Sequence, residues 1–153
     1  MHVPFIAHWP RQLEAGRQLE GISMGTDLLP TVLDWLDLPL PADRVIDGKS
    51  LRGMLERAEV SPHDFLYYFA HEKLIALRDD RYKYHDRRAV IYTLEPLGFG
   101  YGTSHGPWLF DTTVDRNESY DVSMTHTAEA TRMREAFARK RDEFRRNLRG
   151  WVE

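Results

Sequence analysis

Apolar residues in the first third of the chain recur at helical spacing and predict an amphipathic helix over 27–36. The stripe that this helix should bury consists of Leu28, Leu29, Val32, Leu33 and Leu36. Asp27 is placed to cap the helix, and Pro30 would occupy its third position, where a missing N–H costs nothing. Pro39 and Pro41 then end the helical pattern.

A longer helical pattern begins near Thr125 and continues toward the end of the chain. Its apolar stripe, at spacings of three, four and seven, consists of Ala130, Met133, Phe137, Phe144 and Leu148. Its other faces mix Arg132, Arg134, Arg139, Lys140, Arg141, Arg145, Arg146 and Arg149 with Glu129, Glu135, Asp142 and Glu143. This mixture favours a solvated surface helix that is docked through its apolar stripe.

The region between the two helices is rich in aromatic and branched residues, which favour strands. Candidate strands cover 65–69, 74–78, 81–85, 89–92 and 108–110. Asp79 and Asp80 lie between the second and third of them and predict a hairpin, in which Tyr82 and Tyr84 share one face. The glycine-rich stretch 97–102 should form a loop before the last strand.

The chain also begins with a short apolar run, 3–9, whose flanking prolines predict an edge strand. After Ser61 and Pro62 the pattern changes from helical to strand-like spacing, which places a boundary there. We therefore expect an α+β fold in two parts, 1–60 and 61–153. In it a small antiparallel sheet is covered by the long C-terminal helix and preceded by one strand and one helix.

Composition narrows the chemistry of the chain. The absence of cysteine excludes a disulfide framework, a thiolate metal site and a cysteine nucleophile. A net charge of -3 argues against a dedicated nucleic-acid binder. No apolar run approaches the roughly 20 residues that cross a bilayer, and the first residues lack the pattern of a secretory signal, so we expect no membrane partner and no targeting segment.

The histidines are the other candidates for metal ligands. They are His2, His8, His63, His71, His85, His105 and His126. They form no pair at the helical or strand spacing typical of a compact site. We therefore expect no metal site in this chain.

Five motifs occur in a fixed order along nearly the whole chain. They are Val3-Pro4-Phe5-Ile6 with His8-Trp9-Pro10, Asp27-Leu28-Leu29-Pro30-Thr31, Asp47-Gly48-Lys49-Ser50-Leu51, Arg81-Tyr82-Lys83-Tyr84, and Leu109-Phe110-Asp111 followed by Asp115 and Glu118. Each motif alone is weak. In this order they resemble the C-terminal region of the sulfatase family, and in particular its arylsulfatase-like branch.

The resemblance implies that 1–60 is the tail end of an α/β catalytic domain and that 61–153 is the C-terminal subdomain. The family hydrolyses sulfate esters with a formylglycine nucleophile and a calcium ion. Neither the Cys/Ser-x-Pro-Ser/Ala-Arg motif nor the calcium motif occurs here, so no residue of this chain is expected to be catalytic. Calcium and formylglycine are expected in a full-length protein, and the missing N-terminal catalytic domain is the expected partner. Related phosphate and phosphonate ester hydrolases share this architecture, which leaves the ester class open.

Substrate recognition is a role that the resemblance leaves to this segment. His105, Tyr101 and His71 are the candidates to face the substrate, the first two because a glycine-rich loop suits close approach to a ligand. The alternative is an ordinary surface loop with ordinary histidines.

Two further hypotheses concern the chain by itself. Uncovered apolar surface on the 27–36 helix, or an exposed edge at 3–9, predicts self-association into oligomers. The basic residues of the C-terminal helix also suit a stand-alone domain that binds anionic ligands.

Overall fold

The computed structural model of the chain describes residues 3–70, 73–94 and 98–146, without the side chains of 88–105. The chain divides into two compact units, the first ending at Asp64 and the second beginning at Phe65. Each unit is described separately.

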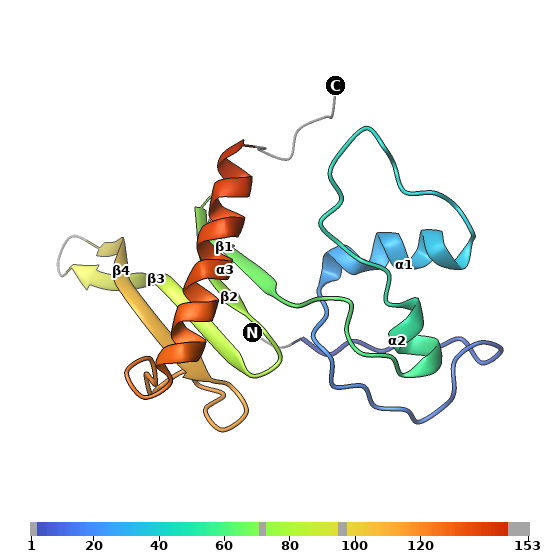
Figure 1. Cartoon of the computed structure of the whole chain (residues 1–153), viewed down its shortest axis with the longest axis horizontal. Helices are drawn as coiled ribbons and strands as arrows, with labels where there is room; N and C mark the ends of the chain where they lie inside the picture. The colour runs from blue at the N-terminus through green and yellow to red at the C-terminus, as the bar shows by residue number, and fades with distance from the viewer. Residues whose placement is uncertain (1–2, 71–72, 95–97, 147–153) are drawn as a thin grey trace. The chain divides into compact units, whose positions relative to one another are not determined.

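The first unit is mostly loop with three short helical segments. They are η1 (Gly25–Asp27), α1 (Leu28–Trp35) and α2 (Arg52–Arg57) (Figure 1). Its buried hydrophobic side chains in the described part are Ile22, Leu51 and Met54. The unit therefore has little apolar core of its own.

Helix α1 forms where the sequence predicts it, but with a different buried face. Pro30 and Thr31 are its buried residues. The predicted stripe is exposed to a large degree: Leu28 by 48%, Leu29 by 50%, Val32 by 48% and Leu36 by 61%. The stripe is not buried within this chain, which agrees with the expectation that the 27–36 helix by itself leaves apolar surface uncovered. Asp27 provides no side-chain cap either, because its carboxylate is directed elsewhere.

The predicted edge strand at 3–9 is also absent. These residues form no strand, and Val3, Phe5 and Ile6 are exposed. A strand requires a neighbour to receive its backbone hydrogen bonds, and no described residue pairs with this segment. Composition alone therefore misassigned it.

The second unit is an antiparallel sheet with one helix. Its elements are β1 (Leu66–Ala70), β2 (Lys73–Arg78), β3 (Tyr82–Leu94), β4 (Gly98–Asp111) and α3 (Thr127–Arg146). The strands lie in chain order, β1-β2-β3-β4, and each neighbour is antiparallel. The α+β prediction of a four-stranded sheet with a C-terminal helix is confirmed.

Strands β3 and β4 continue well beyond their pairing with the rest of the sheet. β2 pairs with β3 only as far as His85, whereas β3 and β4 pair from Tyr82 opposite Asp111 to Leu94 opposite Gly98. Residues 98–102 of the glycine-rich stretch predicted as a loop therefore lie within β4, which corrects that assignment, and Leu97 lies outside the described residues. The antiparallel ladder supplies the hydrogen bonds that glycine-rich backbone would otherwise lack.

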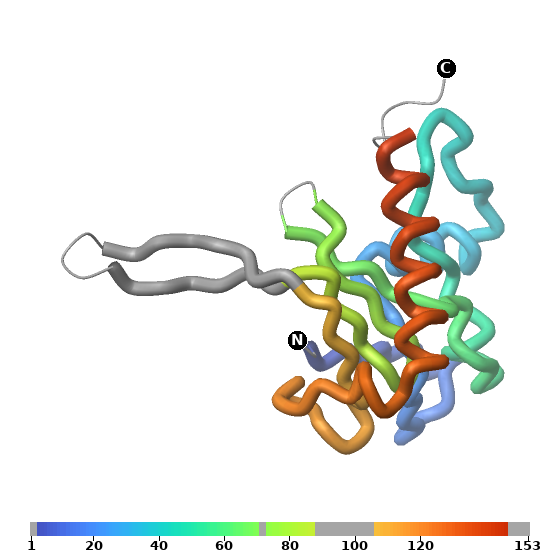
Figure 2. Tube along the Cα trace, turned by 60° about the vertical axis from the view of Figure 1, so that its left-hand side comes forward, coloured from blue at the N-terminus to red at the C-terminus, as the bar shows by residue number. Residues whose placement is uncertain are grey.

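Helix α3 lies along one face of this sheet, as both views show (Figures 1 and 2). The core between them contains Leu74, Leu77, Tyr82, Tyr84, Leu109, Met133, Ala136 and Phe137. Tyr82 and Tyr84 share the helix-facing side, as alternation along a strand requires, and Met133 and Phe137 come from the predicted stripe. The predicted shared face of Tyr82 and Tyr84 and the predicted burial of Met133 and Phe137 are confirmed.

Candidate functional site

The three residues predicted to face a substrate cannot be placed by their side chains. His71 lies outside the described residues. Tyr101 and His105 are assigned to β4 by their backbone, and their side chains lie outside the described part. Their role in substrate recognition stays a prediction.

A buried carboxylate organises the first unit. Asp27 is fully buried, and its Oδ2 accepts a hydrogen bond from the Met24 backbone N–H at 2.8 Å. Its Oδ1 accepts the backbone N–H of Lys49 at 2.9 Å and lies 2.8 Å from Nε2 of the buried His63. We call these four residues the Asp27 cluster. It joins three segments that are distant in sequence, and burial of the carboxylate is compensated by its donors.

Two neighbours complete the anchoring of this loop. The hydroxyl of Thr31 donates to the Asp27 carbonyl at 2.6 Å and accepts the Leu51 N–H at 2.9 Å. Gly48 passes so close to η1 that a Cβ placed there would lie 2.0 Å from the carbonyl oxygen of Thr26. The Asp-Leu-x-Pro-Thr and Asp-Gly-Lys-Ser-Leu motifs are thus parts of one scaffold.

A charged cluster occupies the second unit, on the sheet face opposite α3. Lys83 Nζ donates to Glu118 Oε1 at 2.5 Å, and His85 Nε2 lies 2.7 Å from Glu118 Oε2. We call these three residues the Glu118 cluster. Glu118 has a positive φ of 56°, a left-handed conformation that is uncommon for a residue with a side chain. The Tyr-Lys motif and the Asp-x-x-Glu motif therefore meet in space.

The electrostatics of this cluster favour an ionised Glu118. Burial alone would raise the pKa of Glu118, but hydrogen bonds from His85 and Lys83, together with their charges, lower it to about 2. The Lys83 ammonium also lies 4.7 Å from the centre of the Tyr68 ring. Burial raises the pKa of Tyr68, which keeps its hydroxyl protonated.

One polar atom of the cluster has no partner. Nδ1 of His85 is buried and makes no hydrogen bond within the described part of the chain. His85 itself is 8% exposed and packs its ring edge-on to Phe110. Sequence reasoning identified Lys83 and Glu118 through motifs but not His85 or His63, because two histidines distant in sequence from their carboxylates give no local signal.

The remaining acidic residues of the last motif hold turns in place. Asp111 accepts from Arg81 at 2.8 Å, and Asp115 accepts the backbone N–H groups of Ser119 and Tyr120. These contacts account for the motif without any ligand.

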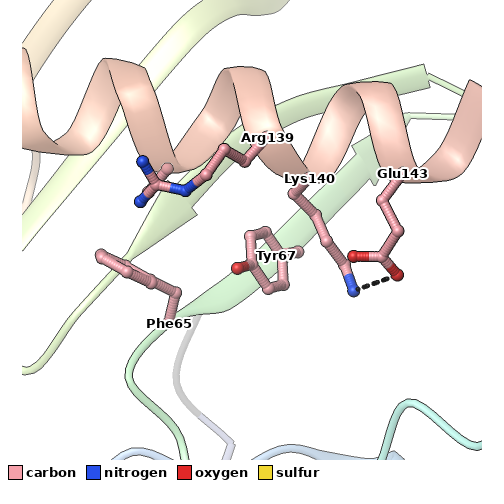
Figure 3. Close-up of a pocket in the computed structure, with 6 residues that line it drawn as sticks. Phe65, Tyr67, Arg139, Lys140 and Glu143 are labelled. Atoms are coloured by element: carbon pink, nitrogen blue, oxygen red, sulfur yellow. Dashed lines mark hydrogen bonds and ion pairs between the residues drawn. The ribbon is translucent and has the colours of Figure 1, made fainter.

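A small pocket opens between β1 and α3, with a volume of about 210 Å³. Its lining residues are Phe65, Tyr67, Ala136, Arg139, Lys140 and Glu143, and we call it the β1–α3 pocket. Figure 3 shows Phe65 and Tyr67 beneath the helix, with Arg139, Lys140 and Glu143 reaching down from it. Lys140 Nζ donates to Glu143 at 3.1 Å and lies 5.0 Å from the Tyr67 ring centre.

The described side chains do not gather a metal site. No group of three or more His, Cys, Asp or Glu residues among them could hold a metal ion. None of the described helices has the length and apolar character that crossing a membrane requires.

The chain was compared with known proteins by sequence. No family model matches the chain. Human steryl-sulfatase is 38% identical over 79 residues, which are 51% of this chain and 14% of that protein. The arylsulfatase of Hemicentrotus pulcherrimus is 32% identical over 96 residues, 63% of this chain and 17% of that protein. About half of this chain is thus similar in sequence to steryl-sulfatase and arylsulfatases. The chain spans less than a fifth of the length of these relatives.

Solved sulfatase structures share the fold. The PsFucS1 sulfatase from Pseudoalteromonas superposes with a TM-score of 0.68 at 24% identity, covering 86% of this chain and 28% of that one. A protein solved with its substrate D-glucosamine-2-N,6-O-disulfate gives a TM-score of 0.61 at 18% identity, covering 91% and 28%. The fold match corresponds to the C-terminal region of these sulfatases.

Proposed function

We propose that this chain is the C-terminal portion of an enzyme that hydrolyses sulfate esters and that it is inactive by itself. The observation that carries the proposal is the use of the shared motifs as scaffold: the Asp27 cluster and the Glu118 cluster join motifs that the resemblance to sulfatases rests on. Such residues position a segment within a larger protein and perform no chemistry themselves.

The chemistry of sulfate transfer would come from the rest of the enzyme. The chain has no cysteine and no Ser-x-Pro-x-Arg to supply formylglycine, and the described side chains offer no set of calcium ligands. The residues present do not fit either group, so we assign formylglycine and calcium to the missing catalytic domain. The contribution of this chain would be packing surface and substrate recognition, the latter through Tyr101, His105 and His71.

Helix α1 supplies the packing surface in this proposal. Leu28, Leu29 and Val32 of α1, together with Leu36 at its C-terminal cap, are exposed apolar residues in a unit that is poor in core. Covering half-exposed side chains of this size contributes about 1 kcal/mol each. We propose that the catalytic domain covers them, and that in the isolated chain a second copy does so.

The proposed docking can be tested in the full-length enzyme with Leu29→Asp. Leu29 occupies the first turn of α1, where an acidic residue is favourable for the helix, so the variant places charge on the apolar face without disfavouring helix formation. We expect the activity toward 4-methylumbelliferyl sulfate, or the yield of soluble enzyme, to fall at least tenfold.

Val60→Asp is the matched control, because Val60 is 90% exposed and lies outside α1. Equal effects of the two substitutions would contradict docking through α1.

The isolated chain should show no turnover of the same ester, and turnover by it would overturn its assignment as a non-catalytic portion. Light scattering that shows only monomers at high concentration would contradict self-association.

The alternative function, a stand-alone binder of anionic ligands through α3, receives less support. Several cations of this helix already have acidic partners: Arg132 with Asp79, Lys140 with Glu143 and Arg141 with Asp142. Such pairing reduces the positive field that a polyanion would bind. No nucleic-acid or membrane partner is part of either proposal.

A further inference from the structure

The β1–α3 pocket is separate from the Glu118 cluster. Tyr67 pairs with Leu77, and Leu77 with Tyr84, so these three residues share the helix-facing side of the sheet. Lys83 alternates with Tyr84 and lies on the opposite face. The pocket is therefore not explained by the scaffold that links the motifs.

Its lining combines three kinds of chemistry. Phe65 and Tyr67 are half-buried aromatic rings whose centres are 6.5 Å apart. Arg132 lies 5.6 Å from the Phe65 ring centre and Lys140 lies 5.0 Å from the Tyr67 ring centre, and the remaining surface of the rings is apolar. Arg139 is exposed and presents a planar guanidinium, which suits two oxygens of one anionic group. Glu143 adds an acceptor that a hydroxyl group can donate to.

Lys140 fixes one wall of the pocket. Its side chain is 16% exposed, and its ammonium is held by Glu143 and lies near the rings of Tyr67 and Phe144. A cation held between aromatic faces and a carboxylate is already oriented, so a ligand need not order it. Arg139, Lys140 and Glu143 together leave the lining with one net positive charge.

These features select a ligand of mixed character. A free inorganic anion would use the cations but would make no apolar contact with the aromatic rings, and the Glu143 carboxylate would repel it. A purely apolar ligand would offer no counter-charge to the Arg139 guanidinium. The volume of about 210 Å³ lies below the roughly 300–1,000 Å³ typical of pockets for drug-sized ligands, so the ligand is small.

We propose that the β1–α3 pocket binds one sugar unit that carries an anionic ester group, with Arg139 on the anion, the aromatic rings on the carbon face of the ring and Glu143 on a hydroxyl. The proposal rests on the proposed function, in that a sulfatase meets such sugars as substrates or products. The pocket would hold a neighbouring unit of the substrate rather than the ester that is cleaved, because the chain itself lacks the catalytic groups.

The test measures binding by NMR in the full 153-residue chain, with glucose 6-sulfate as the probe. We expect a dissociation constant on the order of 1 mM, which suits a small, open site. Backbone amide signals of Phe65, Tyr67, Arg139 and Glu143 should shift together. Glucose and inorganic sulfate should each bind at least fivefold more weakly than glucose 6-sulfate, because glucose lacks the anionic group and sulfate lacks the sugar ring.

Two variants make the test specific. Arg139→Gln should weaken binding about tenfold through loss of a charge-assisted hydrogen bond, whereas Arg134→Gln should change it less than twofold. Arg134 is exposed on the same helix and does not line the pocket, so it removes the same charge elsewhere.

Three outcomes would overturn the proposal: no shift at the pocket residues, equal losses in the two variants, or equal affinity for inorganic sulfate. The measurement requires neither turnover nor a catalytic domain. Failure of this binding test and failure of the docking test in the full enzyme are therefore distinguishable.

Discussion

In the first unit the fully buried Asp27 accepts hydrogen bonds from two backbone N–H groups and one histidine. In the second unit Glu118 accepts hydrogen bonds from the side chains of Lys83 and His85. The surroundings differ as well. The first unit buries three hydrophobic residues in its described part, and the second has a continuous core of eight residues between sheet and helix. A unit with little core depends more on its polar contacts, so the Asp27 cluster should matter more to its unit than the Glu118 cluster does to the sheet.

The largest effect is expected from Asp27→Ala. The substitution leaves the backbone N–H groups of Met24 and Lys49 and the ring of His63 without their acceptor in a buried site. We expect the free energy of unfolding of the first unit to fall by more than about 3 kcal/mol. Hydrogen exchange should show loss of protection at Met24 and Lys49 while the amides of β2 stay protected.

Asp43→Ala is the control for this prediction. Asp43 is exposed and pairs with its neighbour Arg44 in the described contacts, so its loss should leave the stability of the first unit nearly unchanged. If both variants reduce protection equally, the Asp27 cluster is not what organises the first unit.

Glu118→Gln should have the next largest effect. The pKa of Glu118 falls from 4.5 to about 2 on folding, so ionised Glu118 stabilises the fold above pH 4.5 and this contribution is lost as the pH falls toward 2. We expect the variant to lose about 3 kcal/mol at pH 7 and to show a weaker loss of stability between pH 4.5 and 2 than the unchanged protein. Urea unfolding at pH 7 and pH 3 measures both quantities.

Glu135→Gln, on an exposed position of α3, removes the same charge outside the cluster and should leave both quantities nearly unchanged. An acid response of Glu118→Gln identical to that of the unchanged protein would show that Glu118 titrates normally in the fold.

The smallest effect is expected from Arg132→Gln. Arg132 donates to Asp79, but its side chain is 48% exposed, and Asp79 keeps the backbone N–H groups of Arg81 and Tyr82 as donors. The loss should stay below about 1 kcal/mol in a urea titration. A loss comparable to that of Glu118→Gln would mean that surface pairs, and not the buried cluster, dominate the stability of the second unit.

Sequence patterns predicted the second unit better than the first for a physical reason. The stripe containing Met133 and Phe137, and the alternation of Tyr82 and Tyr84, report burial within the same unit. The apolar residues of α1 and of 3–9 follow the same patterns but are exposed here. Periodicity reveals that a face is apolar, and it does not reveal which chain covers it.

The contacts of the two clusters could be predicted only in part. Motifs identified Asp27, Lys83 and Glu118, but assigned Asp27 to a helix cap that it does not form. The approach of His63 to Asp27, across 36 positions, and of His85 to Glu118, across 33, depends on the folded path of the chain. The glycine-rich stretch in β4 was misassigned because its pairing with β3, and not its composition, determines its backbone conformation.

The close passage of Gly48 beside Thr26 limits which amino acids can stand at position 48. Each of the other nineteen amino acids has a Cβ atom. At position 48 that atom would lie 2.0 Å from the carbonyl oxygen of Thr26, which is too close for two non-bonded atoms. Any such change moves the loop that carries Lys49 away from Asp27. Gly48 is thus a position in the Asp-Gly-Lys-Ser-Leu motif where even a methyl group would disturb the contact between Lys49 and Asp27.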